Sequence, residues 1–308
     1  MKIRYVAFFL ILVLASAVPL RSTKVDPAER AASHILLGRV EGADGFYGVT
    51  ERGDNLIYSR VRVKADKWLK GKNGNSVEFV VEGGSVGDVG LRVSDIPEFS
   101  KGQTVKLYLK KTGLMFNFQE GEILEEVDIK AKAAQATGGC CKSYASWPGG
   151  AAVYLVNPNC NDATVADAAA EIKAGADEWN AGLPVLAYGG TTALAVTAND
   201  GQNLVYFCGG CGGSTIARTY FWYSKRSGQM LGFDIIFYDA WPFYDQQHLG
   251  SCINDGFPLR TIAAHELGHG VGIDHNRCPD SIMYPYAIRC IDNHVTEIDL
   301  ACLAKLYQ

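Results

Sequence analysis

Cysteine is absent from the first 139 residues of this 308-residue chain, and histidine is scarce, with six residues in total. After the N-terminus, no segment has the run of about 20 apolar residues that a transmembrane helix needs. The net charge of -4 is small, so the composition gives no reason to expect nucleic acid or an anionic membrane as a partner. The remaining composition, 48% hydrophobic and 20% charged, is typical of a globular protein.

The N-terminus has the pattern of an export signal. Lys2 and Arg4 are basic, the next ten residues are apolar or aromatic, and Ala15-Ser16-Ala17 offers small residues for cleavage. We therefore expect residues 1–17 to be a signal peptide and the mature protein to be secreted or extracellular. An uncleaved anchor or a lipoprotein signal is the alternative, although no cysteine near the cleavage site could carry a lipid.

All nine cysteines lie between Cys140 and Cys302. In an exported chain this distribution predicts disulfides within the second half. Because nine is odd, at least one thiol is free, pairs with another molecule or binds a metal. Such unequal cysteine usage also indicates two separate folding units.

The first unit, residues 31–130, is predicted to be an all-β domain and follows a polar N-terminal segment. Its strand-like segments alternate in polarity and are separated by turn residues. They include residues 35–40, 58–63, 77–81 and 105–109. The order of these segments loosely resembles netrin-like, OB-type barrels, which implies a small barrel or sandwich serving as an accessory or pro-domain. Residues 131–149 are expected to be a linker, in continuation of a charged, Ala/Lys-rich stretch.

The second unit, residues 150–308, alternates between strand-like and helix-like segments. Asp162-Ala163-Thr164 is a candidate N-cap for a helix through Trp179, and Pro258 suits the first turn of a later helix. Thr296 begins a capping signal before a C-terminal helix. The expected strands are residues 151–156, 185–188, 203–207, 215–223 and 230–238.

A metal-binding pattern lies in the sequence HELGHGVGIDH, which begins at His265. His265 and His269 are four residues apart, so a helix places both imidazoles on one face, as zinc ligands require. Gly272 allows the chain to turn sharply and bring His275 back as a third ligand. Three protein ligands leave one position open, which is typical of a catalytic Zn2+ site, and Glu266 is placed to act as general base.

The alternative is a helix that carries these polar residues by chance. A bare HExxH arises by chance in about 1% of chains this size, and the glycine and third histidine lower that about a thousandfold. Half of the six histidines lie within these eleven residues. The pattern therefore favours one catalytic zinc ion.

The pattern HExxHxxGxxH followed by a methionine turn is the metzincin signature, and Met283 in DSIMYP resembles that turn. The flanking segments VNPN, TIARTYFWY and VTEIDLACLAKLY follow the order of matrixin-like peptidases over about residues 150–308. The resemblance implies an α+β metzincin-type domain: a twisted, mostly parallel sheet with an antiparallel edge strand, plus active-site and C-terminal helices. It also implies that Met283 forms an apolar floor below the zinc.

The resemblance further implies that a protein or peptide substrate binds in extended form along the edge strand. By position we expect that edge between Thr215 and Tyr223, where main-chain hydrogen bonds would provide affinity. Oligomeric state cannot be read from the sequence.

Some features depart from the matrixin pattern. Asn276 follows the third histidine where matrixins usually have Ser or Thr, and Pro285 stands where related families have a tyrosine ligand. A second, structural zinc motif is not recognisable, and structural Ca2+ has no clear loop to support it. His248 and His294 stand alone and are expected to be structural.

The cysteines allow several interpretations. Cys208 and Cys211 are better explained as a disulfide than as a zinc ribbon. A bridge between Cys278 and Cys290 would brace the methionine turn. Cys140 or Cys141 could inhibit the zinc as a cysteine switch, but a disulfide is the better interpretation because the usual switch context is absent.

Together these observations predict a secreted zinc endopeptidase in which Glu266 activates water against internal peptide bonds. A binding or adhesion protein with a vestigial zinc domain is one alternative. In another, residues 31–130 carry the main role as an inhibitory or substrate-recruiting module.

Overall fold

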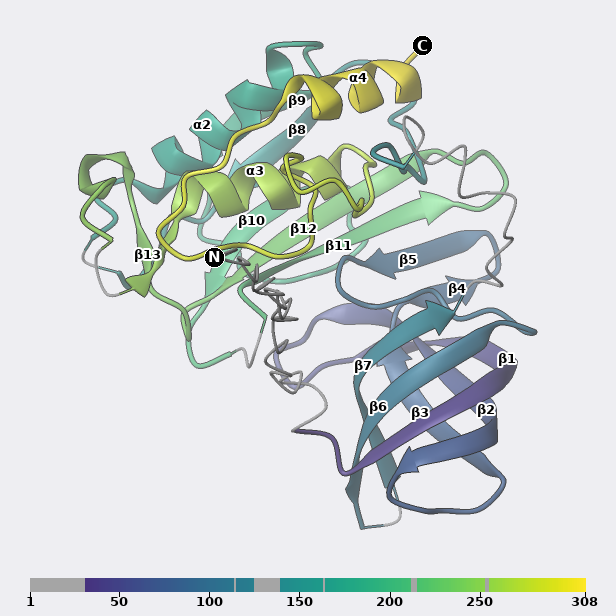
Figure 1. The fold of residues 1–308 in the computed structure, drawn as a ribbon. Coiled ribbons are helices and arrows are strands. Elements are labelled where there is room, and N and C mark those ends of the chain that lie inside the picture. The colour runs from purple at the N-terminus through teal and green to yellow at the C-terminus, as the bar shows by residue number, and fades with distance from the viewer. Residues whose placement is uncertain (1–30, 114, 125–138, 163, 212–214, 253–254) are drawn as a thin grey trace, which may run out of the picture.

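The computed structural model describes residues 31–308 except 114, 125–138, 163, 212–214 and 253–254. It contains a β-barrel, and beside it a larger sheet whose far side is covered by helices (Figure 1). We call residues 139–308 the C-terminal domain. The expected signal peptide, residues 1–17, lies outside the described residues.

The barrel is closed in the order β1-β2-β3-β7-β6. Inward residues alternate with outward ones, as in β3, where Val77, Phe79 and Val81 are buried. The barrel core is apolar, and Val61, Val63 and Leu107 are fully buried in it. The strands are β1 (His34–Val49), β2 (Asn55–Lys70), β3 (Ser76–Glu82), β6 (Thr104–Thr112) and β7 (Met115–Leu124).

Two short strands between β3 and β6 leave the barrel. Strands β4 (Gly84–Val86) and β5 (Val89–Val93) form a hairpin that joins the sheet of the C-terminal domain. The resulting seven-stranded sheet has the order β4-β5-β11-β12-β10-β8-β9. This hairpin was not predicted from the sequence, because its strands are only three and five residues long.

Within the C-terminal domain, β9, β8, β10 and β12 are parallel and β11 is antiparallel. Helices α2, α3 and α4 cover one face of the sheet (Figure 1). The strands are β8 (Ala152–Val156), β9 (Leu186–Thr191), β10 (Leu204–Cys208), β11 (Ala217–Ser224), β12 (Met230–Tyr238), β13 (Phe243–Tyr244) and β14 (Phe257–Pro258). The helices are α2 (Ala168–Asn180), η2 (Gln246–His248), α3 (Leu259–Gly270) and α4 (Glu297–Leu306).

The two faces of this sheet bury different cores. Phe221, Phe233 and Ile235 face the helices. On the opposite face, residues such as Tyr220 and Trp222 pack against Leu56 and Ile57 of β2 and against Leu91 and Val93 of β5. The barrel therefore shares a hydrophobic core with the C-terminal domain.

Strand β11 is not an edge strand in this structure, which corrects the expectation for residues 215–223. β5 pairs antiparallel with it, from Tyr220 opposite Val93 to Ser224 opposite Val89. An unpaired strand edge presents free N–H and C=O groups, and another segment of the same chain has satisfied them here. The edge strand of the extended sheet on this side is instead β4.

The described part of the expected linker, residues 139–149, packs into the C-terminal domain. The hydroxyl of Tyr144 donates to the carbonyl oxygen of His269 at 2.9 Å, and Trp147 Nε1 donates to that of Gly270 at 3.0 Å. This stretch is therefore part of the folded unit. Upstream, residues 120–124 continue β7, within the expected all-β domain.

The start of helix α2 also differs from the expectation. Asp167 is the N-cap, and its side chain accepts from the amide of Ala170. Asp162 instead accepts from the amide of Phe243 and so holds a neighbouring loop. The capping signal at Thr296 is confirmed, since Thr296 and Asp299 form a capping box.

Four disulfides join eight of the nine cysteines: Cys140–Cys278, Cys141–Cys302, Cys208–Cys211 and Cys252–Cys290. The Cys278–Cys290 bridge that the sequence left as a possibility is not formed, because Cys278 pairs with Cys140 and Cys290 with Cys252. The predicted disulfides of Cys140, Cys141, Cys208 and Cys211 are present. Cys160 is the free cysteine.

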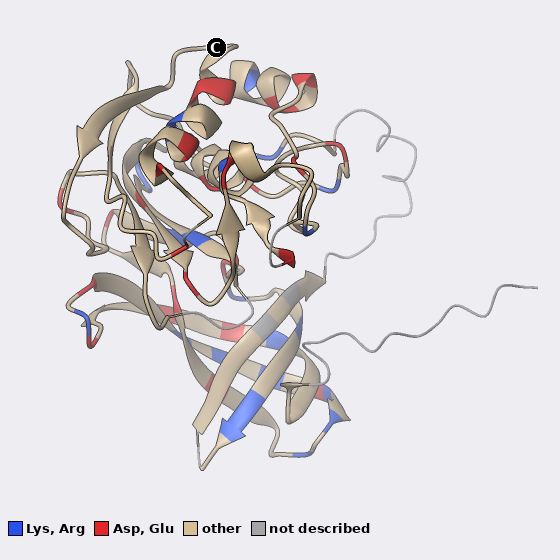
Figure 2. Ribbon diagram, turned by 90° about the vertical axis from the view of Figure 1, so that its left-hand side faces the viewer, with Lys and Arg blue, Asp and Glu red and all other residues tan. Residues whose placement is uncertain are grey.

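Charge is mixed over the surface. Lys and Arg colour several barrel strands, and Asp and Glu colour helices and loops of the C-terminal domain, but neither region carries one sign alone (Figure 2). Among the described residues, no helix combines the length and apolar character required to cross a membrane.

Candidate metal centre and active-site cleft

Helix α3 is packed closely against α2 and the loop below it. Trp179 of α2 donates its indole N–H to the carbonyl oxygen of Ala264 at 2.7 Å. A Cβ atom on Gly175 would lie 2.8 Å from the backbone nitrogen of Ala264, and one on Gly268 would lie 2.3 Å from Met283 Sδ. These glycines let the neighbouring elements approach α3 and fix the positions of its side chains.

The three histidines predicted to bind metal lie close together in the structure, as their spacing in the sequence predicted. Nε2 of His275 lies 3.1 Å from Nε2 of His265 and 3.2 Å from Nε2 of His269. Ligands of a tetrahedral zinc with Zn–N bonds of about 2.0–2.1 Å would be about 3.3 Å apart. Both the type of donor and its spacing therefore fit a zinc ion.

The other ring nitrogens fix the orientation of two of these imidazoles. Nδ1 of His265 donates to the carbonyl oxygen of Ile282 at 2.7 Å, and Nδ1 of His269 donates to that of Ile273 at 2.8 Å. In this tautomer each Nε2 carries a lone pair directed at the shared point, which is the metal-binding form. A cation there would relieve the mutual repulsion of these lone pairs.

The environment keeps all three rings neutral. Burial lowers the pKa of His265 and, together with the charges of the other two histidines, lowers that of His269 well below the usual value. Burial and the charge of His265 lower the pKa of His275 to about 3. Neutral imidazole is the form that binds metal, so near neutral pH protons do not compete with a metal ion for these nitrogens.

Gly272 has the role that the sequence indicated. Its φ is +96°, and a Cβ atom there would lie 1.8 Å from the carbonyl oxygen of Ala145. The positive φ turns the chain out of α3 and returns it to the site at His275. Asp274, the residue before this histidine, forms an ion pair with Lys142 at 2.8 Å.

Met283 is fully buried beside Gly268, below the helix turn that carries the histidines. The preceding residue, Ile282, is held by α4, because its amide donates to Asp299 Oδ2 at 3.0 Å. Asp299 is 1% exposed and also accepts from Ser281 Oγ and from the amide of Thr296. The C-terminal helix thus positions the carbonyl that orients His265.

Glu266 is 5% exposed and points to β11. The hydroxyl of Thr219 donates to Glu266 Oε2 at 2.6 Å. Burial, followed by the negative charge of Asp95, raises the pKa of Glu266 to about 8. A divalent cation held by the imidazoles would lower this pKa and favour the carboxylate.

The site opens into a cleft of about 1530 Å³. His265, Glu266 and His275 lie along it, together with residues 215–218 before and within β11. The aromatic residues Tyr284 and Tyr286, after the methionine turn, line another part of the cleft. Residues 94–98 and several barrel residues line it as well, so both domains form its surface.

The lone histidines His248 and His294 contact carboxylates elsewhere. Nδ1 of His248 is 2.6 Å from Asp245, and Nδ1 of His294 is 3.1 Å from Glu178. Over the part of the chain that the structure describes, the other close group of possible metal ligands is Cys252, Asp255 and Cys290, whose cysteines are joined in a disulfide.

Sequence reasoning missed Thr219, Asp95 and the positioning role of Asp299. The capping box was the signal for Asp299, but its second role depends on a tertiary contact. Thr219 approaches Glu266 through the packing of β11 against α3, and Asp95 does so through the pairing of β5 with β11. No local pattern revealed either contact. Cys140 and Cys141 are both in disulfides, which excludes them as a zinc-binding switch in this structure.

Comparison with known proteins bears on residues 155–308, which match the sequence model of the Matrixin family, peptidase family M10. Over 36 residues, 12% of this chain, the sequence is 47% identical to matrix metalloproteinase-9 of Canis lupus familiaris, covering 5% of that protein. Over 64 residues, 21% of this chain, it is 30% identical to the 72 kDa type IV collagenase of Gallus gallus, covering 10% of it. The chain spans a tenth or less of the length of these relatives.

Proposed function

The chain belongs to the matrixin family of zinc metallopeptidases, and from this premise we propose that it is a secreted zinc-dependent endopeptidase. The observation that carries the proposal is the convergence of three imidazole Nε2 atoms at 3.1 and 3.2 Å beside the buried carboxyl of Glu266. His265, His269 and His275 would hold one Zn2+. The barrel does not enter this proposal.

In the reaction, bound zinc would supply Lewis acidity that polarises the scissile carbonyl and a water molecule. Glu266 takes the proton of the attacking water and passes it to the departing amine nitrogen. The hydroxyl of Thr219 donates to Oε2 and so holds the carboxyl in place, and Oε1 would be the oxygen that takes the proton. Met283 supports the metal site from below as an apolar floor.

Secretion is supported by the basic and apolar pattern of residues 1–17 and by the four disulfides. The substrate would be a protein or peptide that lies in the cleft in extended form. Residues 215–218 line the cleft, and main-chain pairing with the substrate would involve Ala217, because the carbonyl oxygens of Thr215 and Ile216 already accept hydrogen bonds.

The decisive test is Glu266→Gln in the full chain, with casein as substrate and zinc content measured by mass spectrometry. Loss of the proton acceptor should lower kcat/KM by roughly 100- to 10,000-fold while zinc remains bound at one ion per chain. The matched control is Glu297→Gln on exposed α4, which should retain activity. Undiminished turnover by Glu266→Gln would refute its role as base.

The metal ligands need a separate test, since Glu266 does not bind zinc in this proposal. His269→Ala should lower zinc content and activity together, because two remaining imidazoles bind zinc weakly. His294→Ala, on an exposed residue, is the matched control and should leave the zinc content unchanged. Full zinc occupancy in His269→Ala would remove this residue from the ligand set.

A further inference from the structure

The β5 segment, which we define as residues 89–94, lies on the strand where a peptide substrate is expected to pair. β5 covers β11 from Ser224 to Tyr220. The contact continues at Thr219, whose carbonyl oxygen accepts from the amide of Ser94 at 3.0 Å and whose amide donates to Ser94 Oγ at 3.1 Å. The backbone N–H and C=O groups on this side of β11 are therefore already bonded to the β5 segment from Ser224 as far as Thr219.

Thr219 is also the residue that binds Glu266, through its hydroxyl at 2.6 Å from Oε2. The β5 segment thus ends level with the catalytic carboxyl. Beyond this level the chain turns away, because the amide of Ile96 donates to the carbonyl oxygen of Val93 at 3.0 Å. Residues 215–218, on the other side of Glu266, still line the open cleft.

Apolar burial holds the β5 segment firmly in place. Leu91 and Val93 are 1% and 3% exposed and belong to the core that the two domains share. Gly90 lies under the ring of Tyr223, where a Cβ atom would be 2.4 Å from the nearest ring carbon. Displacing this segment would expose these side chains to water.

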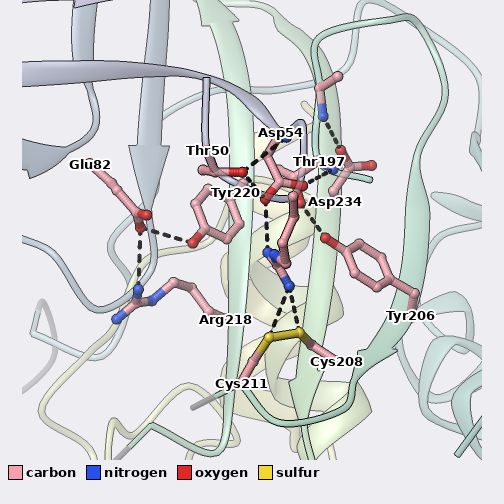
Figure 3. Close-up of polar contacts among 12 residues, drawn as sticks. Thr50, Asp54, Glu82, Thr197, Tyr206, Cys208, Cys211, Arg218, Tyr220 and Asp234 are labelled. Atoms are coloured by element: carbon pink, nitrogen blue, oxygen red, sulfur yellow. Dashed lines mark hydrogen bonds and ion pairs between the residues drawn. A yellow bond between two sulfur atoms is a disulfide. The ribbon is translucent and has the colours of Figure 1, made fainter. Parts of the chain in front are cut away.

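Polar contacts between the domains add to this attachment (Figure 3). Glu82 accepts from Tyr220 at 2.8 Å and pairs with Arg218 at 3.3 Å. Asp54, 1% exposed, accepts from the amide of Thr197 at 2.9 Å. Each of these contacts would be lost if the barrel moved away from the sheet.

The cleft beside the β5 segment is nevertheless open, with about 1530 Å³ that reaches His265, Glu266 and His275. Asp95, directly after the segment, faces this space and is 38% exposed. The β5 segment is therefore anchored and still leaves the site accessible. It restricts the positions that a substrate can take along β11, and it does not close the cleft.

We propose that the β5 segment is a fixed specificity element that fills one half of the peptide-binding edge. A substrate then forms main-chain pairs with β11 only before Thr219, at Ala217, because the carbonyl oxygens of Thr215 and Ile216 already accept hydrogen bonds. Its other side is not recognised along the sheet. This inference rests on the proposed peptidase function and adds to it an asymmetry of recognition. The residues that impose it are Leu91, Val93 and Ser94.

The first test measures kcat/KM for quenched-fluorescent peptides with one fixed cleavage site, extended by one to four residues on either side. Each main-chain hydrogen bond gained should raise kcat/KM by roughly 2- to 10-fold. We expect this rise for extension on one side and a change below about 2-fold on the other. Equal gains on both sides would overturn the proposal.

Ser94→Ala removes the hydroxyl that accepts from the amide of Thr219, but the amide of residue 94 stays bonded to the carbonyl oxygen of Thr219. The segment therefore still occupies this half of the strand, and extension on the insensitive side should still change kcat/KM by less than about 2-fold. Ser85→Ala removes a hydroxyl from β4, which does not pair with β11, and should leave the asymmetry intact. A larger gain on the insensitive side in Ser94→Ala would mean that one hydroxyl, and not the segment, imposes the asymmetry, and would overturn the proposal.

The second test does not depend on catalysis. Hydrogen exchange of residues 89–94 is measured in the full-length Glu266→Gln variant, with and without a saturating uncleaved eight-residue peptide from the first test. We expect protection to be unchanged by the peptide. Faster exchange on peptide binding would mean that substrate displaces the segment, which would overturn a fixed element in favour of a self-inhibitory one.

The two proposals fail in different ways. If no peptide is cleaved or bound although zinc is present, the peptidase function is wrong and this inference falls with it. If peptides are cleaved with symmetric length dependence, or if residues 89–94 are unprotected in the free protein, only the inference is wrong.

Discussion

The barrel and the C-terminal domain achieve order by different means. The barrel contains no cysteine, and its core is a closed set of aliphatic and aromatic side chains. The C-terminal domain has all nine cysteines, and most buried polar residues lie in it, among them Glu266, Asn276 and Asp299. A closed barrel satisfies its backbone through strand pairing, whereas loops around a metal site need cross-links and side-chain hydrogen bonds.

The difference has a functional meaning. The segments that bring His275 and Met283 to α3 are irregular, and the Cys140–Cys278 disulfide and Asp299 hold them. Irregular backbone costs conformational entropy, and the cross-links reduce the entropy of the unfolded chain. The following predictions ask how independent the two regions are, from the largest expected effect to the smallest.

Removing the two long-range disulfides should have the largest effect on stability. Cys140–Cys278 and Cys141–Cys302 close loops of 138 and 161 residues, and with one bridge in place the other still closes the short loop between Cys278 and Cys302. Replacing all four cysteines with serine should therefore cost about 8 kcal/mol on loop-entropy grounds. Since the two bridges start at adjacent residues, either one alone retains most of this effect. Urea unfolding of the full chain measures the loss.

The matched control replaces Cys208 and Cys211, which are three residues apart. Such a short loop should cost under about 2 kcal/mol on the same grounds. In both variants, native-state hydrogen exchange should show that the barrel strands retain more protection than α3. Equal loss of protection in both regions would show that the disulfides stabilise the molecule as one unit.

Leu91→Ala tests the core that the two regions share. Leu91 is 1% exposed and packs in the cluster that contains Tyr220 and Trp222, so its truncation should cost about 3 kcal/mol. Exchange should accelerate in β11 and β12 as well as in the barrel. Leu107→Ala, fully buried in the barrel core, is the control and should accelerate exchange in the barrel alone. If Leu91→Ala affects only the barrel, the shared core does not couple the regions.

Much of the metal site could be predicted because local rules determine it. Helical spacing places His265 and His269 on one face, and the positive φ of Gly272 is the conformation that glycine favours. The metzincin resemblance extended this to Met283, and the matrixin match over residues 155–308 supports the family assignment.

What could not be predicted depends on contacts between distant segments. The β4–β5 hairpin has short strands, and its pairing with β11 accompanies the core that the barrel and the C-terminal domain share. The disulfide partners of Cys278 and Cys290 depend on which chain segments meet in space, and sequence alone does not give connectivity. Residues 215–223 were assigned as the edge strand by resemblance to matrixin-like domains. The additional strands β5 and β4 extend the sheet beyond these residues, so β4 is the edge strand instead.

Asp299→Asn should have a smaller effect on stability and a selective effect on zinc. The buried carboxylate accepts from Ser281 Oγ and from the amides of Ile282 and Thr296, so losing its charge should cost about 2 kcal/mol. Because Ile282 orients His265, zinc affinity should fall by roughly 10- to 100-fold in a chelator competition. Glu297→Gln on the same helix controls for the lost charge. Unchanged zinc affinity would mean that the methionine turn keeps its place without Asp299.

The smallest effect is expected where the two regions do not differ, at their exposed ion pairs. Lys173–Asp177 on α2 and Arg62–Asp44 on the barrel are both about half or more exposed on each side chain. Solvent screens such pairs, so Lys173→Ala and Arg62→Ala should each change the free energy of unfolding by about 0.5 kcal/mol or less. Thermal unfolding at low and high salt measures this. A loss of stability above about 1 kcal/mol for only one of the two variants would mean that surface ion pairs also stabilise the two regions unequally. The regions would then differ in more than their buried residues and disulfides.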